Sequence, residues 1–594
     1  MNIQSIQKTL PLKPQQIFLE HATGSSIFSP PSQPISPNST QLTIGEALVK
    51  TLEDMGVRYA FGVSGGGIGP LWATLNRSNI ELLHFRHESG AAFAACEAFF
   101  ASDRPVVVFT TTGPGITNAL TGLFAARGEG AKVILLSAAT PTGNRGRWAC
   151  QETSAYTMPM SGIFTSGPIF NYATTLESED ELPEISRRLA LGLSQPGGFV
   201  AHISIPTSLQ TMPLKLRLPE QVFSYSVPTA SEEAIAECVK LLSQETFAIW
   251  AGFGAKNAAR EICLLAEKTG AAVMTSPRGK GIFPEDHPQY VGVTGFSGHM
   301  SVLKYMQEQC PQRILVLGTR LGEPTSFWHP AMVPAGGFIH VDIDSQVPGV
   351  AYPLVETLSI QSEVKVFLQA LLKQFPSSLD FPVFMFSRPE RTVSPRRPEG
   401  LVQPDVLMDA IQKVIVGGSH VIVMAEAGNS FAWATHLLRF TEPGRYRIST
   451  GVGAMGHAVT GVLGAALGRN SKAVAIVGDG AMLMNSEVST AVKFQIPCVW
   501  IVLNDGRYNM CAQGMALQGF KGVDTEIPCT DFVMLAKAMG ADGICVKRES
   551  DIEIALETAL LSSIPFVVDV RIDATQLAPI GGRIRSLIEQ GAKE

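Results

Sequence analysis

The chain has 594 residues, 45% of them hydrophobic, and a formal net charge of −6 at pH 7. This length predicts three or four domains of about 150 residues, each able to bury a core of its own. The slightly acidic balance, without a block of basic residues, argues against a nucleic-acid-binding protein, and no uncharged apolar run of about 18 residues predicts a membrane span. Small-molecule chemistry is the class of function that remains.

Residues 1–40 precede the first apolar pattern. Their Ser/Pro-rich tract "TGSSIFSPPSQPISPNST" cannot bury enough surface to offset the entropy of ordering, which predicts a disordered N-terminal extension. A transit peptide is the alternative, and the presence of two lysines but no arginine argues against it.

Alternating helical and strand patterns begin at residue 41, and the first domain is expected over 41–212. Its predicted elements are a helix, a strand, an Ala-rich buried helix and two further strands, at 43–57, 59–63, 87–101, 105–112 and 197–206. Uninterrupted apolar strands are typical of parallel sheets that are covered on both faces. These residues therefore predict a doubly wound α/β domain.

The same alternation returns in a central domain over 226–375 and in a third domain over 401–594, which a Pro-rich linker at 376–400 connects. The fold class predicted for the chain is α/β, with three doubly wound parallel-sheet domains. The stretch "GFGAKNA" (252–258) imitates a dinucleotide-binding turn, but it lacks the third glycine and a suitably placed acidic residue, so nicotinamide binding is not expected.

The nine cysteines form no C-x-x-C pair and no cluster with histidine along the sequence. We therefore predict neither a disulfide framework nor a zinc site. Free thiols persist in reducing compartments, so a cytoplasmic location is expected.

Two aspartates follow apolar strands in the third domain. Asp479 comes after "AVAIVG" and Asp505 after "WIVLN", and the carboxyl ends of parallel strands share one edge of a sheet, where α/β folds bind ligands. The turn Gly428-Asn429-Ser430 adds backbone N–H groups for an anion. Together these residues predict a magnesium–diphosphate site, since no P-loop motif is present. Taken alone, Asp479 has a helix N-cap as its alternative role.

The phrase "GDG", followed after about two dozen residues by "ND", resembles the signature of thiamine diphosphate enzymes, and the acetolactate synthase group is the most similar. The resemblance covers residues 41–590, in the order pyrimidine-binding, central and diphosphate-binding domain. The segments that carry it are "FGVSGGGIGPLWATL" (61–75), "FRHESGAAFAA" (85–95), "TTTGPGITNALTGLFAA" (110–126), "ACQET" (149–153), "TGVGAMGHAV" (450–459) and "MLMNSEVSTAV" (482–492).

The resemblance implies thiamine diphosphate and Mg²⁺ as cofactors and gives three residues catalytic roles. Glu88 resembles the carboxylic acid that hydrogen-bonds the pyrimidine ring, Met455 the apolar wedge that keeps the cofactor bent, and Gln151 a polar residue on the substrate side. From the residues alone, a first-turn glutamate, a core methionine and a solvated glutamine are the alternatives. His87 and His457 are expected to be structural.

The remaining site residues are also implied by the resemblance. The cofactor contacts are Gly66, Gly428, Asn429, Ser430, Gly453, Ala454, Met455, Gly480, Ala481, Asn509 and Met510, and the metal ligands are Asp479, Asp505 and the Arg507 carbonyl. In this family the pyrimidine and the diphosphate are held by different subunits, which implies a homodimer or a homotetramer. The implied substrates are small 2-oxo acids, without a nucleic-acid or membrane partner.

Three positions depart from the family pattern. Asp505 stands where most relatives have asparagine, and catabolic acetolactate synthases resemble this chain at that position. The aspartate adds negative charge beside a diphosphate. Gly514 stands where many biosynthetic relatives have tryptophan, which predicts a wider acceptor pocket for a bulky or aromatic 2-oxo acid, as in the acyloin synthase of the scytonemin pathway, which the chain also resembles. The stretch 292–301 differs from the flavin-contacting segment and puts FAD binding in doubt.

The reaction implied is decarboxylation of one 2-oxo acid and carboligation of the remaining acyl group to a second one. A simple 2-oxo acid decarboxylase is the nearest alternative, because the fate of the acyl group depends on how water and acceptor reach the pocket. A non-catalytic, regulatory subunit with the same fold is the alternative from a different class.

Overall fold

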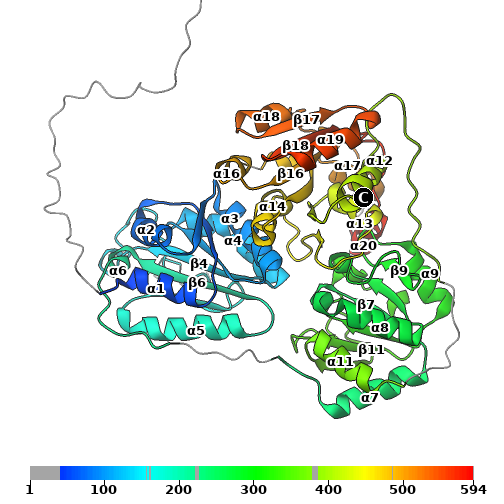
Figure 1. Cartoon of the computed structure of the whole chain (residues 1–594), viewed down its shortest axis with the longest axis horizontal. Coiled ribbons are helices and arrows are strands. Elements are labelled where there is room, and N and C mark those ends of the chain that lie inside the picture. The colour runs from blue at the N-terminus through cyan, green and yellow to red at the C-terminus, as the bar shows by residue number, and fades with distance from the viewer. Residues whose placement is uncertain are drawn as a thin grey trace, which may run out of the picture. The chain divides into compact units, whose positions relative to one another are not determined.

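The computed structural model describes residues 41–155, 157–158, 162–220, 227–376, 386–484 and 486–592. The extension predicted over 1–40 lies outside them. Thr43–Glu594 form one compact unit. This unit holds three sheets, coloured blue to cyan, green, and yellow to red in Figure 1.

The first sheet has six parallel strands in the order β2-β1-β3-β4-β6-β5. The strands are β1 (Tyr59–Gly62), β2 (Glu81–His84), β3 (Val106–Thr110), β4 (Lys132–Ala139), β5 (Tyr172–Thr175) and β6 (Phe199–Pro206). The helices around it are α1 (Ile44–Asp54), α2 (Gly69–Arg77), α3 (Glu88–Ser102), α4 (Pro114–Glu129), α5 (Leu182–Ser194) and α6 (Thr207–Gln210). All five elements predicted for this domain are confirmed.

Local sequence signals set the ends of these helices. Thr43 and Glu46 form a reciprocal capping box at the start of α1, which satisfies two N–H groups that the helix cannot pair. The His87 side chain accepts a hydrogen bond from the Ser89 N–H and so caps α3, which confirms a structural role for this histidine. Pro114 opens α4, where a missing N–H costs nothing.

The middle sheet is also parallel, in the order β12-β11-β10-β7-β8-β9. Its strands are β7 (Phe247–Ala251), β8 (Ala272–Thr275), β9 (Tyr290–Val293), β10 (Arg313–Leu317), β11 (Phe338–Asp342) and β12 (Thr357–Gln361). Its helices are α7 (Glu232–Gln244), α8 (Ala259–Thr269), α9 (Met300–Gln309), α10 (Glu323–Ser326) and α11 (Val364–Gln374), and the turn η4 (Phe253–Ala258) follows β7.

The third sheet repeats the topology of the first, in the order β14-β13-β15-β16-β18-β17. Its strands are β13 (Ile422–Ala425), β14 (Tyr446–Arg447), β15 (Ala473–Gly478), β16 (Cys498–Asn504), β17 (Asp542–Val546) and β18 (Phe566–Arg571). Its helices are α12 (Pro404–Ile411), α13 (Asn429–Leu437), α14 (His457–Arg469), α15 (Asp479–Met482), α16 (Val488–Lys493), α17 (Asn509–Gln518), α18 (Phe532–Ala538), α19 (Ile552–Leu561) and α20 (Gly581–Glu589). The predicted class, three α/β domains with parallel sheets, is confirmed.

Small residues let α3 of the first domain and α14 of the third approach closely. A Cβ added at Gly464 would lie 1.8 Å from the Ala94 carbonyl oxygen, and one added at Gly468 would lie 2.7 Å from the Ala101 Cβ. The two helices share one buried cluster with strands of both sheets. The first and third domains are therefore packed together through apolar contact.

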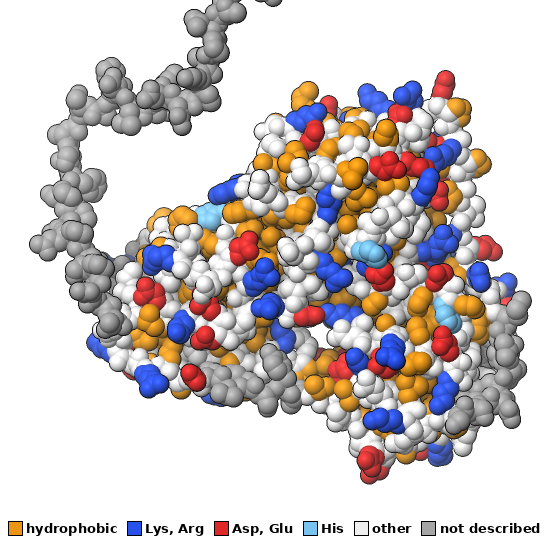
Figure 2. Space-filling model, in the orientation of Figure 1, with side chains coloured by type: hydrophobic (Ala, Val, Ile, Leu, Met, Phe, Trp, Pro, Cys, Tyr) orange, Lys and Arg blue, Asp and Glu red, His pale blue; other side chains and the backbone are white. Residues whose placement is uncertain are grey.

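On the face drawn in Figure 2, acidic, basic and apolar side chains are interspersed. Opposite charges that lie near one another cancel at a distance, so this face produces only a weak long-range field. No helix among the described residues is both long enough and apolar enough to span a bilayer.

Candidate active site

Asp479 lies where β15 ends and is 4% exposed. Its Oδ2 accepts a hydrogen bond of 2.7 Å from the Gly506 N–H in the turn after β16, and its Oδ1 accepts one of 2.7 Å from the Gly480 N–H. The N-cap of α15 is Gly478, so the alternative of a capping aspartate is wrong. Asp479 instead joins the ends of two neighbouring strands, because β15 and β16 pair in parallel.

Asp505 is the second carboxylate at this edge and follows the last residue of β16. Burial and the nearby negative charge of Asp479 raise the pKa of Asp505 to about 7. Burial also raises the pKa of Asp479, although backbone N–H groups of the 505–507 turn counteract it. Each of the two carboxyl groups disfavours ionisation of the other. A divalent cation bound between them would stabilise both ionised forms.

The donor set around these aspartates fits Mg²⁺, which prefers oxygen ligands. The Arg507 carbonyl belongs to the same turn and accepts one hydrogen bond, from the Asn509 N–H, which leaves its second lone pair for a metal. The Oδ1 of Asn504 is buried without a hydrogen-bond partner among the described residues. The Asn509 side chain hydrogen-bonds Asp505 and donates to the Ala574 carbonyl, while Met510 packs at the edge of the third-domain core.

The predicted anion cradle lies beside the two aspartates. Gly428 has φ +102° and caps α13, with no atom within 4 Å of an added Cβ. Ser430 is 1% exposed, and its Oγ lies 4.0 Å from the position of a Cβ on Gly478, so the start of α13 borders the end of β15. The Asn429 Oδ1 is buried without a partner among the described residues. The first N–H groups of α13 have no acceptor within the helix and are suited to a phosphate.

Gly480 and Ala481 lie in α15 next to Asp479. A Cβ on Gly480 would lie 2.5 Å from the Tyr508 ring, so only glycine fits beneath that aromatic side chain. Ala481 is buried. This close packing holds the Asp479 turn against the turn that carries Asp505.

Met455 lies in the loop before α14 and is 40% exposed, so the alternative of a core methionine is wrong. Gly453 has φ +64° and no atom within 4 Å of an added Cβ, and the neighbouring Ala454 is half-buried. The loop therefore presents Met455 on an open surface, which suits contact with a bound molecule.

Glu88 is the first residue of α3 and is 7% exposed. Its Oε2 accepts a hydrogen bond of 3.1 Å from Asn118 on α4, and its Oε1 lies 3.4 Å from the position of a Cβ on Gly115. Glu88 thus lies in the first turn of α3, as its alternative role requires, but its carboxyl group is buried and directed toward the start of α4.

Gln151 and Gly66 lie at the same end of the first sheet as Glu88. The exposed Gln151 has φ +57°, and its carbonyl oxygen lies 2.6 Å from the position of a Cβ on Gly113, just before α4. Gly66 begins a short turn after β1. Among the described residues, no hydrogen bond or ion pair joins Glu88 or Gln151 to Asp479 or Asp505. The chain thus carries two half-sites, one on each of the outer domains.

Two buried glutamates that sequence reasoning missed join the two outer domains to each other. Glu487 accepts hydrogen bonds from the N–H groups of Arg86 and His87, immediately before Glu88, and burial raises its pKa. Glu129, at the end of α4, accepts from the Ser449 hydroxyl and the N–H groups of the next two residues, which lead to Met455. The only signal for them in the sequence is their position: Glu487 lies within the segment 482–492 that resembles the family, and Glu129 follows the segment 110–126.

A third missed group is a buried cluster between α3 and α14. Both oxygens of Glu97 accept hydrogen bonds of 2.9 Å from Arg447, and Oε1 lies 2.8 Å from the Nε2 of His457. Cys96 completes a set of ligand atoms that lie within 4.8 Å of one another. Cysteine and histidine thus meet in space although they do not cluster along the sequence, but Arg447 already occupies both Glu97 oxygens and leaves this cluster unsuited to a metal.

Three family models match this chain in the order of its three sheets. They are described as the N-terminal TPP binding domain, the central domain and the C-terminal TPP binding domain of thiamine pyrophosphate enzymes, and they match residues 42–158, 235–371 and 426–570. Together they cover more than half of the chain.

Curated relatives match over nearly the whole length. A probable acetolactate synthase large subunit of Methanocaldococcus jannaschii is 28% identical, over 92% of this chain and 95% of the relative. The large subunit of acetolactate synthase isozyme 1 of Escherichia coli is 26% identical over 90% and 95%. A putative thiamine pyrophosphate-containing protein of Bacillus subtilis is 25% identical over 91% and 93%.

The family models assign thiamine diphosphate, which is another name for thiamine pyrophosphate, to the two outer domains, and these are the domains that carry the half-sites. The glycine cradle, the paired aspartates and the buried glutamate all lie inside the matched ranges. The chain belongs to the thiamine pyrophosphate enzymes.

Proposed function

We propose that the enzyme uses Mg²⁺ with its thiamine diphosphate, decarboxylates a 2-oxo acid and joins the remaining acyl group to a second 2-oxo acid. The observation that carries this proposal is the pair Asp479 and Asp505, a buried and a half-buried carboxylate at neighbouring strand ends beside the α13 N-terminus. The relatives named acetolactate synthase support the reaction, because each match spans at least 90% of this chain.

When bound, thiamine diphosphate would supply a carbon nucleophile for the 2-oxo group. The protein's own contribution is positioning and proton control. Asp479, Asp505 and the Arg507 carbonyl would hold Mg²⁺, and the first turn of α13 would receive the diphosphate. Glu88 holds or releases a proton at a carboxyl oxygen that Asn118 orients.

The half-sites also support a shared site between two copies of the chain. Glu88 and the aspartates lie on different domains without a polar contact between them, and both the Gln151 loop and the Met455 loop are open in the single chain. We propose a homodimer in which Glu88 of one subunit serves the metal site of the other. A homotetramer built from two such dimers is compatible with this arrangement.

Complementation between two inactive variants tests this arrangement. Glu88→Gln and Asp479→Ala chains, co-expressed with different tags and purified as the heterodimer, are expected to recover about half of the wild-type activity, because one of the two sites then has both residues intact. A site built within one chain predicts no recovery. Measuring the size of each single variant and of the heterodimer in solution distinguishes a site within one chain from a loss of activity through poor folding.

We propose in addition that the acceptor is bulkier than pyruvate. Gly514 is buried on α17, and a Cβ added there would lie 3.2 Å from Ile584 Cδ1 of α20. An aliphatic side chain from the C-terminal helix thus borders Gly514, where a glycine still leaves more room than the tryptophan of many biosynthetic relatives would. Ile584 and Gly514 together limit the width of this region.

The helix α20 is anchored to the middle domain. Glu323 accepts hydrogen bonds of 2.7 Å from Ser586 and Gln590, and it also pairs with Arg583. We expect Ile584→Ala to raise kcat/KM for phenylpyruvate relative to pyruvate, and Gly514→Trp to lower it. Equal effects of each variant on both substrates would contradict a role for this region in acceptor choice.

We propose that the enzyme works without FAD. At the carboxyl edge of the middle sheet the loops after β7 and β10 lie against each other: a Cβ on Gly254 would lie 3.0 Å from Gly318. His299 and Ser297 of the divergent stretch are buried. A purified enzyme that is colourless and fully active without added flavin is the expected result, whereas a flavin spectrum that survives desalting would overturn it.

Product analysis tests the proposed reaction as a whole. Purified enzyme with thiamine diphosphate and Mg²⁺ is incubated with pairs of 2-oxo acids, and the products are identified by mass spectrometry while carbon dioxide release is measured. An acyloin or a 2-hydroxy-3-oxo acid is expected. An aldehyde as the only product would instead identify a simple decarboxylase, and no carbon dioxide from any 2-oxo acid would exclude both.

A further inference from the structure

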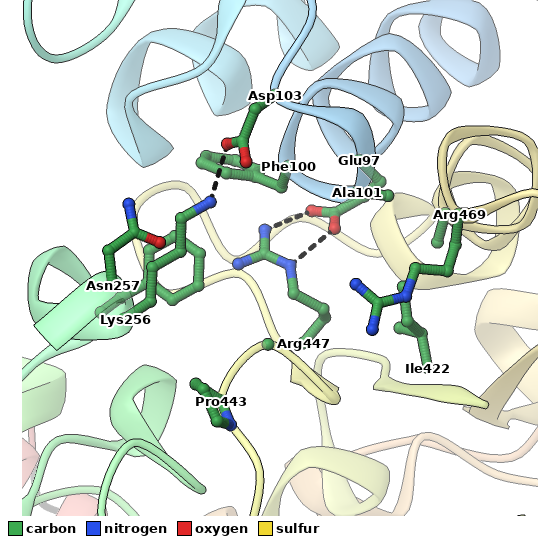
Figure 3. A pocket seen from close by; sticks show the side chains of 13 residues that line it. Glu97, Phe100, Ala101, Asp103, Lys256, Asn257, Ile422, Pro443, Arg447 and Arg469 are labelled. Carbon is green, nitrogen blue, oxygen red and sulfur yellow. Dashed lines mark hydrogen bonds and ion pairs between the residues drawn. The ribbon is translucent and has the colours of Figure 1, made fainter. Parts of the chain in front are cut away.

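A pocket lies at the opposite edge of the third sheet from the aspartates (Figure 3). It is lined by the ends of α3 and α14, by η4 of the middle domain, by the start of β13, and by residues of β14 and the loop before it. Ile422 is the first residue of β13, whereas Asp479 follows the last residue of β15, and the two strands run in parallel. The pocket is therefore separate from the proposed cofactor site.

One wall of the pocket is aromatic. The rings of Phe100 and Phe253 meet edge to face, with centroids 5.3 Å apart. The Arg447 guanidinium lies 4.2 and 4.6 Å from the two ring centroids, where a cation is attracted to the ring faces. This wall offers apolar surface and also fixes a positive charge within the pocket.

Among the charged side chains that line the pocket, one basic side chain has no acidic partner. Glu97 is paired with Arg447, and Asp103 lies 2.8 Å from the Lys256 Nζ. Arg469, by contrast, has no hydrogen bond or ion pair with another described residue, and Figure 3 shows its guanidinium extending from α14 toward the pocket. Three bases against two acids favour an anionic occupant.

We propose that this pocket is a second ligand site, which binds a small monocarboxylate with an aromatic or branched apolar body. Its volume of about 160 Å³ is close to that of a cavity known to hold benzene. The apolar body would pack against Phe100 and Phe253, while the carboxylate would pair with Arg469, whose planar guanidinium matches a carboxylate.

An occupant would also contact the buried network behind the Met455 loop. Arg447 and Glu97 line the pocket, and Glu97 lies 2.8 Å from His457, two residues after Met455. Binding at this second site is therefore expected to change the rate of the enzyme as well as to occupy the pocket.

Calorimetry with benzoate and benzamide tests the site directly, since the two probes have similar shapes and differ in charge. Neither is a 2-oxo acid, so neither is turned over. With the thiamine diphosphate and Mg²⁺ holoenzyme we expect benzoate to bind with a Kd on the order of 1 mM, given its few non-hydrogen atoms, and benzamide to bind about tenfold more weakly. Equal affinities, or no benzoate binding at 20-fold higher concentration, would overturn the proposal.

Variants locate the binding. Arg469→Gln is expected to weaken benzoate binding about tenfold, and Arg469→Lys, which keeps the charge, much less. Ala101→Phe should fill the pocket and block binding, and the exposed Arg188→Gln on α5 is the matched control. Arg469 also lies in the last turn of α14, where a cation stabilises the helix dipole. If Arg469→Gln lowers only the melting temperature and leaves benzoate affinity unchanged, the arginine serves the helix and the proposed site is wrong.

Discussion

The first and third domains have the same strand order but different chemistry at their strand ends. In the first domain, the carboxyl edge offers one buried acid, Glu88, on the helix after β2, together with the Gln151 loop. In the third, the equivalent edge offers two acids on adjacent strands, Asp479 and Asp505, beside a glycine cradle. One scaffold thus carries two differently equipped edges, and these are the edges to which we assign the proposed proton-handling and metal-binding half-sites.

The sharpest test of this division is Glu88→Gln. Glutamine keeps the shape and the contact with Asn118 but cannot release a proton, so we expect activity to fall by about 10²–10⁴-fold. Thiamine diphosphate affinity, measured by calorimetry, should change less than about tenfold, because the proposed diphosphate and metal contacts belong to the third domain. The exposed Glu81→Gln on β2 is the control. Loss of cofactor binding in Glu88→Gln would show that the half-sites are not divided in this way.

The helices α3 and α14 follow equivalent strands of the two domains, and Glu97 joins them. Although burial opposes its ionisation, the Arg447 guanidinium and His457 hold the pKa of Glu97 far below its usual range. Glu97→Gln leaves a buried guanidinium unpaired and is expected to cost about 3 kcal/mol of unfolding free energy at pH 7. Urea denaturation measures this loss, with Glu557→Gln on the surface of α19 as the control.

The pH dependence of the same variant has a definite sign. A carboxyl group whose folded pKa is depressed stabilises the protein above its unfolded pKa, and this stabilisation is lost as the pH falls toward the folded pKa. The difference between wild type and Glu97→Gln should therefore be constant above about pH 5 and shrink by about 1.4 kcal/mol per pH unit below about pH 4. A difference that stays constant down to pH 3.5 would mean that the pKa of Glu97 is not depressed in the fold.

Asp479→Asn is expected to weaken thiamine diphosphate and Mg²⁺ binding by about 100-fold or more. Both carboxylate oxygens accept backbone N–H groups, from Gly480 and Gly506, so the amide nitrogen of asparagine would meet a second donor. Calorimetry at fixed Mg²⁺ concentration measures the loss. Since activity is not needed for this measurement, a wild-type affinity in this variant would place the metal elsewhere.

Local patterns in the sequence were enough to predict the pairing of Asp479 with Asp505. Each follows an apolar strand, and parallel pairing of β15 with β16 brings their ends together. Contacts across domains could not be predicted in this way. Glu97 and Arg447 are 350 residues apart, and Glu487 and Arg86 are 401 apart, so only tertiary packing determines these pairs. Gly514 shows the same limit, because Ile584 borders it from a helix whose position no local signal sets.

Asp505→Asn provides the matched comparison for Asp479→Asn and should have the smallest effect. An asparagine at this position keeps an oxygen for the metal and removes one of two neighbouring negative charges, so the loss of metal attraction is partly offset by weaker repulsion. We expect thiamine diphosphate to bind with Mg²⁺ within about tenfold of the wild-type affinity, measured by calorimetry. If Asp505→Asn abolishes binding as Asp479→Asn does, the two aspartates act as equivalent ligands and the metal site depends on both charges.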